Sequence, residues 1–344
     1  MAIQNKLRLG LLGTSYVSTY AVIAPARQGA DIEVTAVASR DGARAAAFAR
    51  EHDIAQSFGS YADLLADGAI DAVYVGLPNA LHGYWTKEAL AAGFPVLCEK
   101  PMAANADEAQ DMVRTAEATG QPLQEALHWK DHPIAPRIRE LLAGLGRLEE
   151  MDMRYVLPGS FLPRDNIRFS SDLAGGWLMD QGCYCISMAR FVAGEPEAVV
   201  RATAQEAFPG VDGAMEFELA FPGGITARIG GSMIDENQPE IITTVLFHCT
   251  GGTLHVTNPF LPGANPFTAE QGALIVVKRK DGTRHEERAD LVSSWFCQAN
   301  AFAKLVCDWN GSAVPAWDAV ANMRVVDAVY RAAGMAVRQP TTCP

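Results

Sequence analysis

Short apolar runs alternate with helix-compatible segments through residues 7 to 124, and this alternation restricts the fold more than any other feature. The runs are Leu7 to Leu12, Glu33 to Ala38, Asp71 to Gly76, Val96 to Cys98 and Pro122 to Gln124. Strands separated by helices are typical of βαβ units with a parallel sheet. Such sheets bind ligands at the carboxyl ends of their strands. The polar residues that follow each run are therefore the first candidates for a site.

The first run is followed by Gly13-Thr14-Ser15-Tyr16-Val17-Ser18, which aligns with the dinucleotide-binding pattern G-x-G-x-x-G. Ser15 and Ser18 stand at the second and third glycine positions. Small residues let a turn approach a pyrophosphate, and the next helix supplies unpaired N–H groups and a positive dipole end. We expect residues 13 to 17 to contact a cofactor; a plain strand-to-helix turn is the alternative.

The second run is followed by Ser39-Arg40-Asp41, with Arg44 in the next helix. In a dinucleotide fold an acid at this strand end binds the ribose 2′-hydroxyl, whereas a cation there meets a 2′-phosphate. Ser39 occupies the acid position and Arg40 supplies the cation, so the sequence favours NADP over NAD. The alternative is that Asp41 binds the ribose and Arg40 is solvated.

The third and fourth runs also end in polar residues. Leu77-Pro78-Asn79, with His82 in the following helix, comes after the third run, and Glu99-Lys100-Pro101 comes after the fourth. Pro101 has no N–H to donate, so the strand should stop where the two charges emerge. Both groups are expected at the cofactor edge. Glu99 either contacts the cofactor or fixes the lysine, and a surface Glu–Lys pair is the alternative for both charges.

Beyond residue 130 the hydrophobic pattern changes to a period of two. After Glu149 to Val156, strand candidates follow in close succession: Ala198 to Glu206, Gly213 to Phe221, Ile225 to Ile234, Ile241 to Cys249, Thr253 to Thr257 and Leu274 to Lys280. This clustering favours one open, mostly antiparallel sheet. The sequence thus predicts an α/β protein with a dinucleotide-binding domain in residues 1–130 and a second domain in residues 131–344. Two closing helices are expected, Ser293 to Trp309 and Trp317 to Ala336, the last able to pack back on the first domain.

One predicted helix, about Gly176 to Val192, interrupts these strands. Asp180 and Tyr184 are four residues apart, which places them on one helix face. Gly182 within a helix costs about 1 kcal/mol relative to alanine, so a close approach must require it. A buried Asp–Tyr hydrogen bond with a purely structural role is the alternative to a catalytic pair.

Composition excludes several classes of partner. The formal net charge of −12 argues against nucleic-acid and anionic-membrane binders. Seven cysteines show neither zinc-site spacing nor a disulfide framework. We expect no metal, no nucleic-acid or membrane partner, and a cytoplasmic location, because no leader-like or 18-residue apolar stretch occurs.

Taken together, several motifs resemble those of the Gfo/Idh/MocA oxidoreductases. They are Glu99-Lys100-Pro101, Leu77-Pro78-Asn79 with His82, Glu125-Ala126 before His132-Pro133, the Gly-Gly-x-Leu-x-Asp-x-Gly-x-Tyr block ending at Tyr184, and Asn322 to Ala328. The resemblance implies a Rossmann domain for NAD(P), a C-terminal domain whose open sheet commonly mediates homodimers or homotetramers, and an active site between them. Lys100 then matches the family's catalytic lysine. Tyrosine at position 184, where many members have histidine, is similar to the branch with glucose-fructose oxidoreductase, dihydrodiol dehydrogenase and NADP-dependent pentose dehydrogenases.

The resulting hypothesis is hydride transfer between NADP and a hydroxyl-bearing or carbonyl carbon of a sugar, with Tyr184 exchanging the oxygen's proton. A lysine cation about 4 Å from a phenol is worth about 4 kcal/mol at an effective dielectric of about 20, or about three pKa units. Lys100 would thus activate Tyr184, and Asp180 would orient Lys100 or a substrate hydroxyl.

The expected substrate-binding residues are His128, Lys130, Asn166, Arg168, Trp177 and Tyr184. The polar members would donate hydrogen bonds to a polyol, and Trp177 would stack on a ring; each has a solvated or structural role as its alternative. Two other functions stay open: dehydrogenation of a cyclic diol by a dihydrodiol-type enzyme, and a non-catalytic regulator that binds a dinucleotide or sugar.

Overall fold

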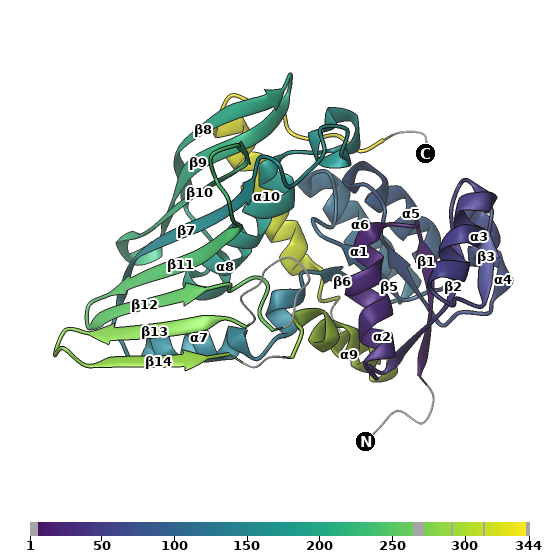
Figure 1. Cartoon of the computed structure of the whole chain (residues 1–344), viewed down its shortest axis with the longest axis horizontal. Coiled ribbons are helices and arrows are strands. Elements are labelled where there is room, and N and C mark those ends of the chain that lie inside the picture. Colours follow the sequence, from purple (N-terminus) through teal and green to yellow (C-terminus); the bar gives the residue numbers. More distant parts are fainter. Residues whose placement is uncertain (1–5, 264–271, 290–291, 312–313, 342–344) are drawn as a thin grey trace. The chain divides into compact units, whose positions relative to one another are not determined.

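The computed structural model describes residues 6–263, 272–289, 292–311 and 314–341 (Figure 1). The chain forms two compact units. The first extends to Leu127, takes up Trp295–Val320 and resumes at Pro340, and the second comprises His128–Ser294 and Ala321–Gln339. This division differs from a single boundary near residue 130, because two late segments join the first unit.

The first unit contains a parallel sheet of six strands in the order β3-β2-β1-β4-β5-β6. The strands are β1 (Leu7–Leu12), β2 (Ile32–Ala38), β3 (Gln56–Phe58), β4 (Ala72–Val75), β5 (Val96–Glu99) and β6 (Leu123–Ala126). The order reverses between β1 and β4, and ligands of doubly wound sheets bind at such a switch point. The predicted parallel sheet is confirmed; only β3 was missed, because its three residues lack an apolar run.

Helices connect these strands. They are α1 (Tyr16–Ser18), the π-helix η1 (Thr19–Ile23), α2 (Ala24–Arg27), α3 (Gly42–Glu51), α4 (Tyr61–Asp67), α5 (Asn79–Ala91) and α6 (Ala106–Thr119). Helix α9 (Ser294–Cys307) follows β14 in the chain, and its residues from Trp295 on belong to the first unit. Side chains cap several of them: Asp41 at α3, Ser60 at α4 and Asn105 at α6 each accept a hydrogen bond from a first-turn N–H group.

The second unit contains a sheet of eight strands in the order β14-β13-β12-β11-β7-β10-β9-β8. The strands are β7 (Leu148–Pro158), β8 (Ala198–Phe208), β9 (Val211–Phe221), β10 (Ile225–Asp235), β11 (Ile242–Cys249), β12 (Gly252–Thr257), β13 (Leu274–Arg279) and β14 (Arg284–Arg288). All neighbours are antiparallel except β7 and β10. The predicted mostly antiparallel sheet is confirmed. β14 was missed because the sequence Arg-His-Glu-Glu-Arg has no apolar alternation.

Helical segments of the second unit are η2 (His128–Asp131), α7 (Ile134–Ala143), η3 (Ile167–Phe169), η4 (Ser171–Leu173), the π-helix η5 (Leu178–Gly182), α8 (Cys183–Ala193) and η6 (Pro222–Gly224). The final helix, α10 (Trp317–Ala332), includes residues of both units. The single helix predicted over Gly176 to Val192 is wrong in detail. Gly176 has φ of +135° and lies outside the helix, and a π-helical turn precedes α8.

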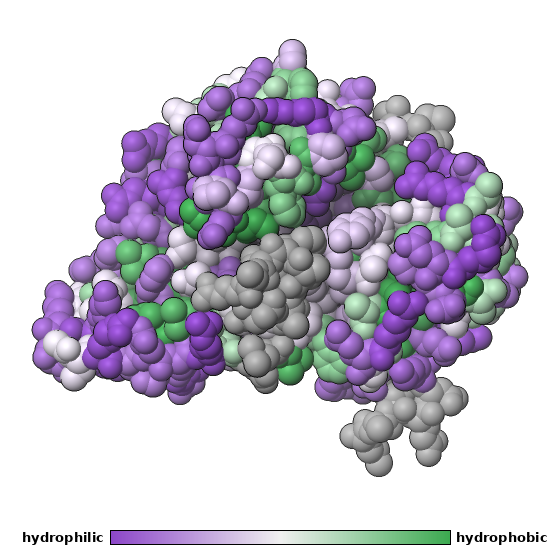
Figure 2. Space-filling view, viewed as in Figure 1, coloured by the Kyte–Doolittle hydropathy of each residue, from purple (hydrophilic) through white to green (hydrophobic). Residues whose placement is uncertain are grey.

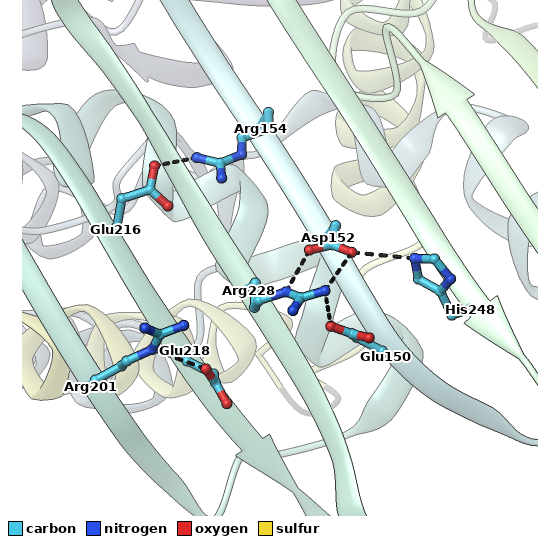
Figure 3. Close-up of polar contacts among 8 residues, drawn as sticks. All are labelled: Glu150, Asp152, Arg154, Arg201, Glu216, Glu218, Arg228 and His248. Atoms are coloured by element: carbon cyan, nitrogen blue, oxygen red, sulfur yellow. Dashed lines mark hydrogen bonds and ion pairs between the residues drawn. The ribbon is translucent and has the colours of Figure 1, made fainter.

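Side chains alternate across the eight-stranded sheet. On β7, Met151, Met153 and Tyr155 are buried, whereas the residues between them lie on the opposite face. That opposite face carries cross-strand ion pairs, including Arg228 with Asp152 at 2.8 Å and Arg201 with Glu218 at 3.1 Å (Figure 3). One face therefore packs on the core of the unit and the other is polar.

The surface seen in Figure 2 is largely hydrophilic, including the outer ends of β13 and β14. In the described part of the chain, none of the helices combines the length and the hydropathy needed to cross a bilayer. Within the same ranges, no three His, Cys, Asp or Glu side chains gather in a group able to hold a metal ion.

Candidate active site

The turn between β1 and α1 requires glycine at position 13. Gly13 has φ of +103°, and a Cβ there would lie 2.8 Å from the carbonyl oxygen of Gly76, the residue after β4. The two turns at the switch point are thus in close backbone contact. Thr14, Ser15 and Val17 are partly exposed and Tyr16 is exposed. Ser15 has extended backbone, and its side chain does not cap the helix that follows, so the first N–H groups of this helix are available to a ligand.

At the end of β2, the predicted cofactor residues form a small basic group. Arg40 and Arg44 are exposed, and both charges act on Tyr61, where burial raises the pKa of the phenol and the two cations oppose that rise. The Oδ1 atom of Asp41 accepts hydrogen bonds from the N–H groups of Ala43 and Arg44 at 2.9 and 3.2 Å. Asp41 is therefore used as a helix cap, which favours the cation over the acid as the ribose-end contact.

Two carboxylates hold the segment that contains Lys100. Glu99 is buried and accepts a hydrogen bond from the Tyr74 hydroxyl at 2.8 Å, and the N–H of Lys100 donates to it at 3.2 Å. Glu125 accepts a hydrogen bond from the N–H of Met102 at 2.9 Å. The Lys100–Pro101 peptide bond is cis. Among the two roles left open for Glu99, the structure supports fixing the lysine segment.

His82 has a different role from the predicted cofactor contact. It is fully buried on α5, with Nδ1 2.9 Å from the carbonyl oxygen of Pro101 and Nε2 2.7 Å from that of Leu77. Burial lowers the pKa of its imidazole. Both ring nitrogens contact backbone carbonyls, so His82 joins the loops after β4 and β5. Pro78 and Asn79, at the start of α5, are partly exposed, as a ligand contact requires.

In the second unit, Tyr184 and His128 form a direct pair. His128 Nε2 lies 2.9 Å from the Tyr184 hydroxyl, and His128 Nδ1 lies 2.8 Å from Ser294 Oγ. The rings of His128 and Tyr184 meet edge to face at 5.6 Å. All three side chains are buried. The phenol is thus held within one unit by an imidazole.

Aromatic side chains surround this pair. Tyr155 at the end of β7 lies 5.9 Å from the Tyr184 ring, and Phe260 lies 5.6 Å from it. Trp177 belongs to the packing behind them. It is completely buried, and its Nε1 donates to the carbonyl oxygen of Tyr155 at 2.9 Å. The sequence predicted that Trp177 stacks on a substrate ring; in the structure the indole is enclosed by protein.

Asp180 is held by a chain of polar groups. Arg168 Nε donates to Asp180 Oδ2 at 2.5 Å, Gln181 also donates to this oxygen, and Asn166 Oδ1 accepts from the N–H of Arg168 at 3.1 Å. Three predicted residues are therefore brought together. The π-helical turn between Asp180 and Tyr184 removes the simple four-residue stacking of an α-helix. Lys130, in η2, is partly exposed.

Sequence reasoning missed Ser294, Tyr155 and Phe260. Tyr155 had a usable signal, since it is the third inward position after Met151 and Met153 on one strand. Ser294 and Phe260 had none, because their partners are far away in the sequence. Gly182 had a signal that was read correctly: a Cβ there would lie 2.7 Å from Leu178 Cδ1 and 2.9 Å from Trp177 Cζ3.

Comparison with models of protein families identifies the family of the chain. Residues 7–127 match the model described as "Oxidoreductase family, NAD-binding Rossmann fold", and residues 137–255 match "GFO/IDH/MocA C-terminal domain". The chain belongs to the Gfo/Idh/MocA oxidoreductase family. The resemblance inferred from the motifs is thereby confirmed.

Several relatives extend over most of the chain. The D-xylose 1-dehydrogenase (NADP(+)) 2 of Haloferax volcanii is 37% identical over 331 residues, 95% of this chain and 97% of that protein. The trans-1,2-dihydrobenzene-1,2-diol dehydrogenase of Sus scrofa is 32% identical over 258 residues, 74% of this chain and 75% of that protein. Among solved structures, a 3-ketoreductase from Actinomadura kijaniata in complex with NADP and TDP-benzene has a TM-score of 0.85 and 26% identity, and the match covers 95% of this chain and 98% of that one.

Proposed function

We propose that this protein is an NADP-dependent oxidoreductase that transfers hydride between the nicotinamide and a hydroxyl-bearing or carbonyl carbon of a sugar. The observation that carries the proposal is the 37% identity to an NADP-dependent xylose dehydrogenase over 95% of the chain. The oxidoreductase class and the NADP preference predicted from the sequence agree with this relative.

The first unit has features that suit a dinucleotide phosphate. Gly13 lets the turn after β1 pack against the turn after β4, which places both turns at the switch point of the sheet, where a dinucleotide would bind. Arg40 and Arg44 put two exposed cations at the end of β2, where a 2′-phosphate would bind. In this proposal residues 13 to 17, Ser39, Arg40 and Arg44 hold the phosphates, and Leu77, Pro78 and Asn79 contact the nicotinamide half.

The bound cofactor supplies the hydride acceptor or donor, and the chain supplies the proton chemistry. Tyr184 gives or takes the proton of the reacting oxygen, because its hydroxyl is already oriented by a hydrogen bond. Lys100 polarises the same oxygen, on a segment fixed by Glu99 and Glu125. Asp180, held by Arg168, orients the lysine or a substrate hydroxyl.

For the substrate, we propose that Lys130, Asn166 and Arg168 donate hydrogen bonds to sugar hydroxyls. The dihydrodiol dehydrogenase relative keeps a cyclic diol as the second candidate. With either substrate the reaction is hydride transfer at a carbon that carries a hydroxyl or carbonyl oxygen.

An absorbance assay at the reduced-nicotinamide band tests the proposal. Purified protein with NADP or NAD would be screened against aldoses, keto-sugars and cyclic diols in both directions. We expect turnover with NADP and at least one aldose. Tight NADP binding without turnover of any substrate would contradict the enzyme and support a regulator.

We also propose a homodimer or homotetramer that associates through the polar face of the eight-stranded sheet, and a cytoplasmic location. The face supports the first proposal, since it carries charged side chains that are partly exposed (Figure 3). The six cysteines in the described ranges are free thiols, as a reducing compartment requires.

A further inference from the structure

We propose that His128 is the proton relay of Tyr184, and that Ser294 orients its ring by accepting a hydrogen bond from Nδ1–H. Sequence reasoning placed His128 among the sugar-binding residues; the structure instead places its Nε2 against the phenol hydroxyl. The inference rests on the proposed function, because it assumes that Tyr184 exchanges a proton with the substrate. It names the residue of the chain that receives this proton.

The geometry has the arrangement of an activated donor. A proton-transfer residue needs a base within about 2.6 to 3.2 Å, and the base needs a third group that orients it. His128 Nε2 is 2.9 Å from the Tyr184 hydroxyl, and Nδ1 is 2.8 Å from Ser294 Oγ. If Nδ1–H donates to Ser294, then Nε2 carries the lone pair and faces the phenol. A neutral imidazole nitrogen accepts a proton far more readily than a neutral phenol oxygen does, so Nε2 is the group beside the hydroxyl that can take its proton.

His128, Tyr184 and Ser294 all belong to the second unit, so their contact forms within that unit alone. His128 and Ser294 are the first and last residues of the long segment of the second unit, and Tyr184 lies on α8 of that unit. The hydrogen bonds therefore join both ends of this segment to the helix that carries the phenol.

The relay balances for the oxidative direction. The Tyr184 oxygen takes the proton of the substrate hydroxyl, and the phenol O–H breaks as an N–H bond forms at His128 Nε2. A bound NADP would take the hydride from the same carbon. His128 becomes the imidazolium, which keeps its Nδ1–H bond to Ser294. In reduction the same proton returns from Nε2 through the phenol to the new hydroxyl. His128 acts through Tyr184, and so it is a positioning residue for proton transfer and need not touch the substrate.

Substitutions separate this role from sugar binding and from packing. His128→Ala should lower kcat by about 100-fold or more, as loss of general acid–base assistance does, with the KM for the sugar nearly unchanged. Added imidazole should restore part of kcat in a saturable manner. His128→Gln keeps a hydrogen-bonding group near the phenol but takes no proton, so it should stay slow. Ser294→Ala should lower kcat by a smaller factor, because the His128 ring can still accept a proton at Nε2.

A measurement on the ligand-free protein gives a second readout. In ¹⁵N NMR of the imidazole rings, His128 should be the Nδ1–H tautomer, and Tyr184→Phe should shift its Nε2 signal. His132 is the matched control, since the N–H of Ile134 donates to its Nδ1 at 3.1 Å and its Nε2 lies 3.1 Å from the carbonyl oxygen of Val292. It should therefore be the Nε2–H tautomer and stay unchanged in Tyr184→Phe.

The outcomes distinguish this inference from the proposed function. If Tyr184→Phe lowers turnover but His128→Ala keeps kcat, raises only KM or is not rescued by imidazole, then the relay is wrong and the enzyme stands. An Nε2–H tautomer at His128 also overturns it. If no substrate turns over at all, the proposed function fails, and the NMR result still reports whether the pair is poised for transfer.

Discussion

At the residue scale, the polar side chains divide into those that face ligand and those that hold others in place. Glu99 and Glu125 lie at the carboxyl ends of β5 and β6, and His82 lies in the helix after β4, yet each contacts the protein itself. The difference is burial: Arg40 is exposed, whereas Glu99 and His82 are enclosed. A charged or polar group that is buried must find a partner, and in these loops the partners are backbone groups and a tyrosine.

Arg40 provides the residue-scale prediction. Arg40→Ala should raise the Kd for NADPH about 10-fold or more, because a charge-assisted contact to a phosphate contributes about 1.5 to 3 kcal/mol. The Kd for NADH should change little, since it lacks the 2′-phosphate. Fluorescence titration with NADPH and with NADH measures the two Kd values. Arg27→Ala is the matched control on an exposed arginine whose ion pair with Asp53 is 3.5 Å long. Equal weakening of NADH and NADPH would remove Arg40 from the 2′-phosphate site.

At the element scale, helix α6 holds the loop that follows Lys100. Asn105 caps the helix by accepting from the N–H of Glu108 at 3.0 Å, and the Glu108 carboxyl accepts from the N–H of Ala104 at 2.8 Å. Burial raises the pKa of Glu108 to about 7, and a Cβ on the adjoining Gly83 would collide with this carboxyl. The loop is therefore held by a carboxyl group that is protonated in weak acid.

Glu108 predicts a pH dependence of stability. Its folded-state pKa, about 7, is above the ordinary value of 4.5, so the folded protein binds the extra proton. This stabilisation is complete below about pH 4.5 and is lost as the pH rises through about 7, by up to about 3 kcal/mol. Glu108→Gln should flatten the decline between these pH values in denaturant unfolding. Asp107→Asn, at an exposed position of the same turn, should leave the decline intact. If the stability of Glu108→Gln declines with pH as steeply as that of the parent protein, then Glu108 is not the group responsible.

At the scale of the whole molecule, the eight-stranded sheet has a face of alternating charge. Arg228 contacts both Asp152 and Glu150, His248 lies 3.3 Å from Asp152, and Arg154 pairs with Glu216 on the adjoining strands (Figure 3). The side chains of these residues are between 31 and 57% exposed. Exposed pairs contribute little to the stability of a single chain, and they are screened by salt. Their larger effect is expected in association.

The sheet face predicts salt-dependent assembly. If two copies meet there, the dimer should dissociate more readily at high salt, and Arg228→Glu should weaken it further, because the substitution adds a like charge beside Asp152 and Glu150. Sedimentation velocity at low and high salt measures the effect. Arg8→Glu is the control, since Arg8 pairs with Asp71 in the first unit. An assembly insensitive to both salt and Arg228→Glu would place the interface elsewhere.

The fold was predictable from the sequence to a large extent because burial acts locally on side-chain pattern. The apolar runs before Arg40 and Lys100 are typical of strands buried on both faces. The period-two segment around Met151 and Met153 is typical of a strand buried on one face. Each pattern therefore predicts its strand directly. Where this local constraint is absent, as in β14, the strand was missed. Its charged residues pair with β13 through the backbone alone.

The sequence by itself thus determined the two sheets, the family and the residue types delivered to each strand end. Only the tertiary structure decided which of them contact protein: the enclosure of His82 and Trp177, the capping role of Asp41, and the His128–Tyr184–Ser294 contact. The physical reason is sequence separation. The partners of His128 are 56 and 166 residues away, and no periodicity connects positions so distant; packing of the folded unit alone brings them within hydrogen-bond distance.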